Sequence, residues 1–447
     1  MSLRARSLRA TRAICALMAG AWLAGAPWAY AQRMASDPPP RDPTAQTDPM
    51  DLGQVLRIVR ESSPRLAIQR ESIAGAEANR ITAGAYPNPN VSFGRSRPYG
   101  GQATLFSGSR QDQATLDVPL LIAGQRPARI ERAEREIEAA RARVAAGASS
   151  LAGEAGTAYV ALLAAQEKAA LLIHANQDLG RLRDIVSSRA ALGVASRYDE
   201  TRIEVELGSF RSKLEDSKAD IADRAGALAA LLGLPSLRPR ATGALAPLPL
   251  EDRWLDGPRE RAPFSPAVVA AAEEEKAARS AVEVAQRERW PVPAVSLGRS
   301  STANPFGAAN FLGLSVEVMV FDTKRGPVAK AESEATAAAL RRELAQAETA
   351  ATLERYGNVI AARQVALQRF DRESASRLAQ LREMSENAYR LGRSSIFELL
   401  DSARSRHELQ QSRIELVASL LDAQVRFLAT GGYLDRVVAG AGAVPQR

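Results

Sequence analysis

Apolar and polar residues change their spacing several times along the chain, and each change predicts a new element. Between Asp51 and about Ala85 the apolar positions follow helical spacing, which predicts one amphipathic helix. Tyr86, Pro87 and Pro89 then end it, because proline has no amide hydrogen and restricts the residue before it.

The spacing becomes alternating directly after these prolines. Over 91–94, and again over 115–120 beyond a Gly/Ser-rich loop, every second residue is apolar; these residues are Val91, Phe93, Leu116, Val118 and Leu120. Such alternation predicts a β-hairpin with one apolar and one polar face.

At Gly124 the spacing returns to that of a helix. Apolar or small residues recur three and four positions apart as far as Leu179, which predicts a coiled-coil seam. If helical throughout, residues 124–192 would span on the order of 100 Å at about 1.5 Å per residue. The sequence "ALGVAS" breaks this helix at Gly193, and a second amphipathic helix runs to Gly233, so an antiparallel helical hairpin is expected.

The same succession of elements occurs twice. After a proline-rich linker the pattern starts again at offsets that drift from 204 to 199 residues, as in the pairs Pro89 and Pro293, Val118 and Val318, and Gly193 and Gly392. A drifting offset indicates a duplication with small insertions and deletions. In the second copy, alternation from Leu312 to Val320 predicts one long strand.

These patterns divide the chain into segments. They are a signal peptide at 1–31, a flexible proline-rich leader at 32–49, a first repeat at 50–233, a linker at 234–263, a second repeat at 264–431 and a C-terminal tail at 432–447. Only 5% of the residues are aromatic, and alanine, arginine, leucine and glutamate dominate, which is typical of long packed helices. The expected fold class is mostly α with some β.

Residues 1–31 have the features of a cleaved signal peptide. Four arginines precede an apolar run from Ala13 to Ala26, and small residues suit cleavage after Ala31. Cleavage removes four arginines and no acid, which lowers the formal net charge from +8 to +4, too little to indicate nucleic-acid binding. It also removes the single cysteine, Cys15, so the mature protein has no disulfide or thiolate site.

Any passage through a membrane must be made by strands, because no apolar stretch beyond Ala31 reaches the about 18 residues of a spanning helix. One chain supplies four strands, whereas transmembrane barrels begin at about eight and leave no edge unpaired in lipid. Three chains of four strands would supply twelve. Alternatively the hairpins are soluble sheets on a periplasmic coiled-coil scaffold, because alternation also occurs in soluble sheets.

Four longer stretches are similar to one known family. They are "YPNPNVSFGRSR" at 86–97, "VPLLIAGQRPARIERAE" at 118–134, "VFDTKRGPVAKAESE" at 320–334 and "YRLGRSSIFELLDS" at 389–402. Over roughly residues 50–431 the chain resembles the TolC-like outer-membrane factors, the trimeric channels of Gram-negative export systems. The resemblance implies a homotrimer with a twelve-stranded β-barrel in outer-membrane lipid, continued by an α-helical barrel across the periplasm.

Partners and cargo follow from the same resemblance. It implies a passive duct without cofactors, docked on a periplasmic adaptor (membrane fusion) protein and an inner-membrane pump of the RND type. "YPNPN", the hairpin and "AGQRPARI" are most similar to the CzcC-type branch, which exports heavy-metal cations. Multidrug-efflux and type I protein-secretion channels share the architecture and remain alternatives. No residue selects a metal, because His174 and His407 are isolated in the sequence and methionine is scarce.

The two breaks between long helices resemble the periplasmic tips of the family. The resemblance implies adaptor contact at Gly193, Gly392, Arg393 and Ser394, and a polar gate at Asp199, Tyr389, Glu398 and Asp401. In the family an arginine stands two residues after the second glycine. Ser394 stands there in this chain and Arg393 precedes it, so the arginine link of the gate is not implied.

Glu398 and Asp401 have two interpretations. They are three residues apart on one helix face, so three chains would place six carboxylates near one axis, where they would attract cations. Alternatively, Ser395 and Glu398 form a capping box, and the acids offset the helix dipole. Both interpretations stay open at this point.

Chemistry of other kinds has little support. The sequence has no Gly-rich phosphate loop, no G-x-S-x-G elbow and no paired-His metal motif, so we do not expect an enzyme. Gly124, Arg126, Arg129 and Arg325 mark the return from strand to helix, where we expect a structural role.

Overall fold

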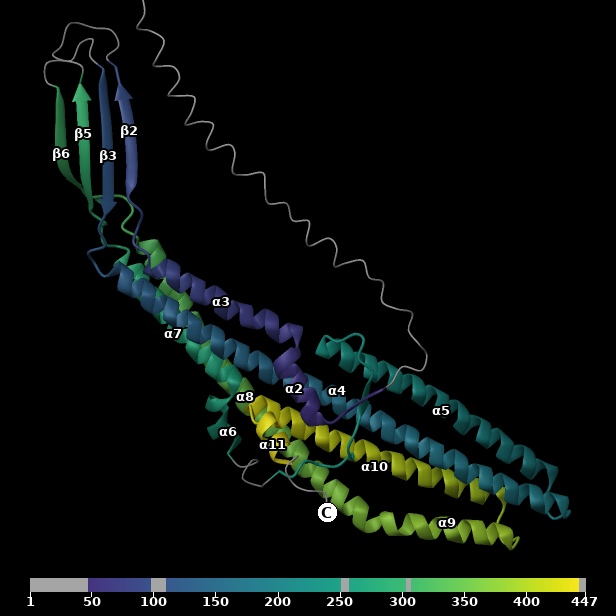
Figure 1. Cartoon of the computed structure of the whole chain (residues 1–447). Helices are drawn as coiled ribbons and strands as arrows, with labels where there is room; N and C mark the ends of the chain where they lie inside the picture. Colours follow the sequence, from purple (N-terminus) through teal and green to yellow (C-terminus); the bar gives the residue numbers. More distant parts are fainter. Residues whose placement is uncertain (1–46, 98–109, 251–256, 303–306, 442–447) are drawn as a thin grey trace, which may run out of the picture. The chain divides into compact units, whose positions relative to one another are not determined.

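Helices make up most of the chain and strands a smaller part, as Figure 1 shows. A computed structural model describes residues 47–97, 110–250, 257–302 and 307–441. The predicted signal peptide, the leader up to residue 46 and residues 442–447 of the predicted tail lie outside the described residues.

The elements are β1 (Asp48–Met50), α2 (Leu52–Ser62), α3 (Pro64–Gly84), β2 (Asn90–Ser96), β3 (Gln111–Pro119), α4 (Gln125–Ala191), α5 (Arg197–Leu232), β4 (Pro239–Ala241), α6 (Pro258–Arg261), the 3-10 helix η2 (Ala262–Phe264), α7 (Pro266–Arg287), β5 (Ala294–Thr302), β6 (Ala308–Ser315), α8 (Arg325–Glu373), α9 (Ala375–Arg390), α10 (Ile396–Gly431) and α11 (Leu434–Ala441). The expected class, mostly α with some β, is confirmed.

Strands of both repeats form one antiparallel sheet in the order β2-β3-β5-β6. The predicted hairpin at 91–120 is confirmed, and its strand β3 also pairs with β5 of the second repeat. Residues opposite one another in antiparallel strands share a face, so the register gives one apolar face. Its rows are Val91, Leu116, Leu297 and Leu312, and beside them Val118, Val295 and Leu314.

The last strand is shorter than the alternation predicts. β6 ends at Ser315, whose partner is Ala294, the first residue of β5. Pro291 and Pro293 precede Ala294, and proline disfavours continuation of a strand, so β5 offers β6 no partner residues beyond this point. The prediction of one strand from Leu312 to Val320 is therefore wrong for its second half.

The first predicted helix is also interrupted. The expectation of one helix from Asp51 to about Ala85 is wrong, because α2 ends at Ser62 and α3 begins at Pro64. Proline suits the first position of a helix but disfavours helical geometry in the residue before it. Ser63 accordingly has φ −68° and ψ 121°, which is extended backbone.

The long first-repeat helix is confirmed. α4 begins after Gly124, which has a left-handed φ of 75°, and continues for 67 residues to Ala191. Its predicted seam is largely buried, for example at Ile137 and Leu162, and α5 packs against it as the expected helical hairpin. Among the helices of the described ranges, none combines the length and apolar character needed to cross a membrane.

The second repeat differs, because its long helix is broken at Ser374 into α8 and α9. We expected each repeat to have one uninterrupted long helix before its turn, and this is wrong for the second. Ser374 stays right-handed helical, with ψ −35°, but its φ of −108° departs from the about −63° of a regular α-helix. Serine is a weak helix former, because its hydroxyl competes for backbone hydrogen bonds, so Ser374 suits a break in the helix.

The predicted leader and linker contain ordered segments. β1, at the end of the leader, pairs in parallel with β4 of the linker, so the leader is not flexible as far as residue 49. The linker is also held on α10, where the buried Gln424 side chain accepts from the Leu248 amide at 2.8 Å and donates to its carbonyl at 3.1 Å.

Small residues allow α4 and α10 to approach closely. A Cβ atom on Gly156 would lie 2.6 Å from Val425 Cγ1, and one on Gly153 would lie 2.8 Å from the Ala429 Cβ. Both distances are too short for carbon atoms, so glycine is required here by packing rather than by backbone conformation.

The junction between sheet and helices is held by arginines, as expected. Arg126 Nε donates to the Gly84 carbonyl at 2.8 Å, and its guanidinium lies 4.7 Å from the ring centroid of Tyr86. Arg129 pairs with Glu288 at 2.9 Å. These contacts join the start of α4 to the ends of α3 and α7.

Candidate functional site

All eight predicted site residues lie in or near two turns, one between α4 and α5 and one between α9 and α10 (Figure 1). Gly193 and Gly392 have φ values of 72° and 69°, a left-handed conformation that glycine adopts readily. The next amide in each turn donates back into the preceding helix, from Val194 to the Arg189 carbonyl at 2.9 Å and from Arg393 to the Ala388 carbonyl at 2.8 Å. Both turns are Schellman motifs.

The helices that leave the turns begin with capping boxes. The Asp199 amide donates to Ser196 Oγ at 3.2 Å, and the Asp199 carboxylate accepts from the Ser196 amide at 3.4 Å. Ser395 and Glu398 repeat this arrangement, with distances of 3.3 and 3.0 Å. The capping interpretation of Glu398 is therefore confirmed, and Asp199 has the same role in the first repeat.

Tyr389 is buried between the hairpins, with 3% of its surface exposed. The guanidinium of Arg189 lies 4.6 Å from its ring centroid. Burial and the negative charge of Asp199 raise the pKa of the Tyr389 hydroxyl, and Arg189 opposes them. The structure thus brings together two predicted gate residues, Tyr389 and Asp199, and adds Arg189 to them.

An aromatic pair connects the two helix starts. Tyr198 and Phe397 occupy equivalent positions in the repeats, and their ring centroids are 6.2 Å apart. Arg202 lies over the Phe397 ring at 5.3 Å. The two aromatic side chains are 56% and 53% exposed, and Leu192 and Leu391 nearby in the turns are exposed too. The turns therefore present apolar surface to the solvent around the single chain.

Further along the hairpins, an ion pair between a buried acid and a partly exposed arginine joins α5 to α10. Arg404 Nε donates to Glu206 Oε1 at 2.7 Å, and a second bond links Nη2 to Oε2. The Glu206 side chain is 6% exposed, and the hydrogen bond from Arg404 lowers the pKa of Glu206. A bidentate pair of this kind fixes the relative position of the two helices that carry it.

The other predicted residues lie on the surface. Arg393, Glu398 and Asp401 are exposed, whereas Ser394 is half-buried and its hydroxyl has no hydrogen-bond partner in the described part of the chain. Asp401 lies about one turn beyond Glu398 on α10. The hydrogen bond with Glu206 raises the pKa of Arg404, and the charge of Asp401 adds to that effect.

Sequence reasoning missed Arg189, Glu206 and Arg404. Comparison of the repeats offers no signal for them, because the equivalent positions hold Ala388, Ser405 and Val205. The one available hint is that Arg189 stands three residues after Val186, on the buried side of α4.

Metal ligands do not cluster in the described residues, where no group of three or more His, Cys, Asp or Glu side chains could hold an ion. His407 is buried and packs edge-on against Phe210, with ring centroids 5.0 Å apart. Burial lowers the pKa of His407, which favours the neutral imidazole.

Three known proteins are similar to the chain in sequence. The cobalt-zinc-cadmium resistance protein CzcC of Cupriavidus metallidurans is 28% identical over 294 residues, covering 64% of this chain and 66% of that protein. The nickel-cobalt-cadmium resistance protein NccC of Alcaligenes xylosoxydans xylosoxydans is 28% identical over 300 residues, 64% of each chain. The chain thus matches just under two thirds of these two relatives. The pyoverdine export outer membrane protein OpmQ of Pseudomonas putida is 26% identical over 413 residues, 86% of each chain.

Solved structures share the fold. A crystal structure of CusC has a TM-score of 0.70 at 15% identity and covers 85% of this chain and 91% of CusC. The outer membrane protein VceC of Vibrio cholerae has a TM-score of 0.69 at 16% identity, over 86% and 96% of the two chains. The sequence profile of the family described as "Outer membrane efflux protein" matches residues 55–234. This match lies almost entirely within the first repeat, so that part of the chain is similar to the outer membrane efflux proteins, and the solved structures share the fold of the chain.

Proposed function

We propose that the chain is the channel subunit of a tripartite efflux system, a homotrimer that forms a passive duct across the periplasm and the outer membrane. In this proposal three four-stranded sheets close a twelve-stranded β-barrel in outer-membrane lipid, and the helical hairpins continue it as an α-helical barrel. A periplasmic adaptor protein and an inner-membrane pump of the RND type are its partners. The duct needs no cofactor, catalyses no reaction and binds no nucleic acid.

One observation carries this proposal, namely that the sheet has an apolar face that is largely exposed in the single chain. Val91, Leu312 and Leu314 on this face are between 70% and 75% exposed. Burial of apolar surface is favourable by about 25 cal/mol per Å², so contact with hydrocarbon suits this face. The edge strands are β2 and β6, whose unpaired backbone groups would each cost several kcal/mol in lipid. Pairing of β6 with β2 of a neighbouring copy satisfies both edges.

Heavy-metal cations are the cargo that we propose, because CzcC and NccC are named for resistance to cobalt, zinc, nickel and cadmium. A second candidate is a larger organic solute. The match to OpmQ, named for pyoverdine export, favours it, since this match spans more of the chain.

The two turns are the proposed periplasmic end of the duct. We infer that Asp199, Tyr389, Glu398 and Asp401 form a gate there, and that Gly193, Gly392, Arg393 and Ser394 contact the adaptor. The burial of Tyr389 beside Arg189 supports this gate, because a polar cluster between two hairpins can hold them together. Arg189 would take the role of the gate arginine that the family has at the position of Ser394.

The segment boundaries proposed for this function are those of the sequence. Residues 1–31 would be removed during export to the periplasm, 50–233 and 264–431 would be the two channel repeats joined by 234–263, and 32–49 and 432–447 would be leader and tail.

Disulfide crosslinking in outer-membrane fractions tests the proposal, since the single natural cysteine lies in the predicted signal peptide. Gly94→Cys on β2 is combined in turn with Cys at 309, 311 or 313 on β6, all on the polar face of the sheet. We expect one of these pairs to give a covalent trimer. The control is Gln113→Cys with the same partners, because β3 is an internal strand and cannot reach a second chain. Recovery of the protein as a soluble periplasmic monomer without crosslinks would contradict the channel proposal and favour the periplasmic coiled-coil scaffold.

A further inference from the structure

A cavity of about 680 Å³ lies between the helical hairpins. Its walls are α4, α9 and α10, with Phe210 of α5 and Phe370 of α8. It has room for on the order of twenty water molecules at about 30 Å³ each, so a small ion fits easily. None of the predicted tip residues lines it.

The lining of the cavity is strongly basic. Four arginines line it, Arg181, Arg382, Arg406 and Arg413, and within the described ranges Asp178 is the one lining carboxylate. His174 and His407 also line it, although they are distant in sequence.

Two of the arginines have acidic partners of their own beside the cavity. Arg413 Nε donates to Asp371 at 2.8 Å, and Arg382 Nε donates to Glu386 at 3.0 Å. These bonds fix the two guanidinium groups and neutralise part of their charge.

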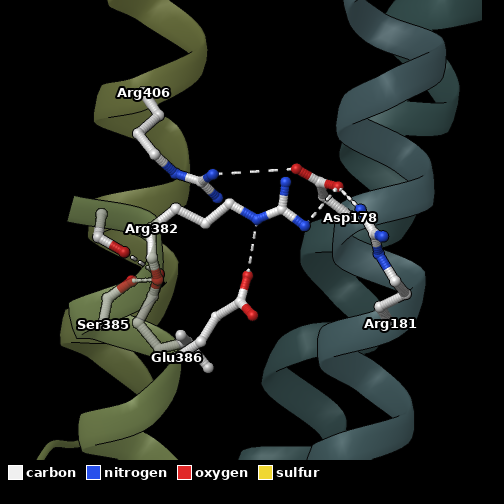
Figure 2. Close-up of polar contacts among 8 residues, drawn as sticks. Asp178, Arg181, Arg382, Ser385, Glu386 and Arg406 are labelled. Atoms are coloured by element: carbon white, nitrogen blue, oxygen red, sulfur yellow. Dashed lines mark hydrogen bonds and ion pairs between the residues drawn. The ribbon is translucent and has the colours of Figure 1, made fainter. Parts of the chain in front are cut away.

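The remaining positive charge gathers around Asp178. Figure 2 shows the guanidinium groups of Arg181, Arg382 and Arg406 converging on this carboxylate from α4, α9 and α10. Arg181 is in close contact with it, whereas Arg382 and Arg406 lie 3.6 and 3.9 Å away. Counted with Glu386, three positive charges face two negative ones.

Arg406 is the least compensated of the three. Its side chain is 13% exposed, and its ion-pair distance of 3.9 Å exceeds the about 2.7–2.9 Å of a charge-assisted hydrogen bond. Its Nε is buried and has no hydrogen-bond partner in the described part of the chain. Burial lowers the pKa of Arg406 and the charge of Arg382 adds to this, whereas the charges of Asp178 and Glu386 oppose it. A buried guanidinium in this state calls for an additional acceptor.

We propose that this cavity binds a small tetrahedral oxyanion of the phosphate or sulfate class, with Arg406 as principal donor and Arg382 and Arg181 as secondary donors. Planar guanidinium groups match oxyanions in geometry as well as charge, because each presents two parallel N–H donors. The bound anion would join α4 of the first repeat to α9 and α10 of the second. The proposal does not depend on what the duct exports.

Titration of the purified full-length protein in detergent with sodium phosphate tests this, with sodium chloride at matched ionic strength as reference. Calorimetry and the thermal unfolding midpoint are both followed at neutral pH. We expect saturable phosphate binding with a rise in the midpoint, and about tenfold or more weaker binding in Arg406→Gln. Arg426→Gln is the matched control, because Arg426 is on the same helix but does not line this cavity, pairs with Asp422 at 2.8 Å, and its variant should bind phosphate like the wild type. Equal affinity in Arg406→Gln and wild type, or no saturable binding at all, would overturn the proposal.

The direction in which a second substitution changes the phosphate affinity distinguishes anion binding from a purely structural role. Asp178→Asn removes the carboxylate that competes with the anion, so phosphate should bind more tightly, whereas weaker binding contradicts the site. If Arg406→Gln does not assemble, Arg181→Gln replaces it, because the Arg181 side chain is 62% exposed and its substitution should not prevent assembly. An unchanged affinity of Arg181→Gln for phosphate would then contradict the proposal. Acetate at the same concentrations should not raise the midpoint. An equal rise with acetate overturns the assignment to phosphate and sulfate, and points to the carboxylate of a neighbouring chain.

Discussion

The carboxylate of Glu206 on α5 forms a bidentate ion pair with the guanidinium of Arg404 on α10, and the acid is almost completely buried. The two residues do not occupy equivalent positions in the repeats, so each hairpin supplies what the other lacks. The pair therefore joins the first helical hairpin to the second at one defined register.

Loss of the arginine alone should destabilise the protein more than loss of both partners. Arg404→Gln leaves a buried charge on Glu206, which we expect to cost about 1–3 kcal/mol, toward the lower end because Arg404 is 43% exposed. Adding Glu206→Gln should restore part of this stability. Thermal unfolding followed by circular dichroism measures both variants, with the surface-pair variant Arg426→Gln expected within about 0.5 kcal/mol of wild type. Equal midpoints for the single and double variants would contradict the prediction.

The ion pair of Glu206 and Arg404 also predicts how the stability of the folded chain depends on pH. The hydrogen bond from Arg404 holds the pKa of Glu206 in the folded chain below its ordinary value of 4.5. A depressed pKa contributes stability that is fully present above about pH 4.5 and is lost as the pH falls through the folded value. The midpoint difference between wild type and Arg404→Gln should therefore be constant from about pH 5 to 7 and shrink below about pH 4. A difference that grows on acidification would exclude this cause.

Elements with strong local signals could be predicted from the sequence. The Schellman turns follow from Gly193 and Gly392, and the capping box at Ser395 and Glu398 follows from spacing alone, because each depends on residues within one turn of a helix. The strand end at Ser315 could not be predicted, since it depends on a partner strand and its prolines rather than on the alternation of β6.

The central part of the candidate site could not be predicted from the sequence for a different reason. Tyr389 and Asp199 came from family resemblance, but Arg189, which lies on the Tyr389 ring, comes from a helix two hundred residues away in the chain. Such a contact is created by packing of the two hairpins, and neither periodicity nor comparison of the repeats contains it.

Close packing of α4 on α10 predicts a large effect of one methyl group. In Gly156→Ala the new Cβ would lie 2.6 Å from Val425 Cγ1, so we expect a loss of about 1–3 kcal/mol through overpacking. Gly180→Ala is the matched control on the same helix, because a Cβ there meets nothing within 4 Å. That variant should gain up to about 1 kcal/mol from helix propensity. Thermal unfolding of both proteins checks the opposite signs, and two similar midpoints would refute the close contact.

Tyr389→Phe separates folding from gating. The Tyr389 hydroxyl is buried without a hydrogen-bond partner in the described part of the chain, so its removal should leave stability unchanged or slightly higher. The phenyl ring retains contact with Arg189, whereas Arg189→Gln removes a cation–π interaction worth about 0.5–2 kcal/mol. If the proposed gate uses the hydroxyl in the trimer, single-channel conductance in planar bilayers should rise in Tyr389→Phe at an unchanged thermal midpoint. Unchanged conductance in this variant, together with increased conductance in Arg189→Gln, would assign the gate to the stacked ring and the arginine instead.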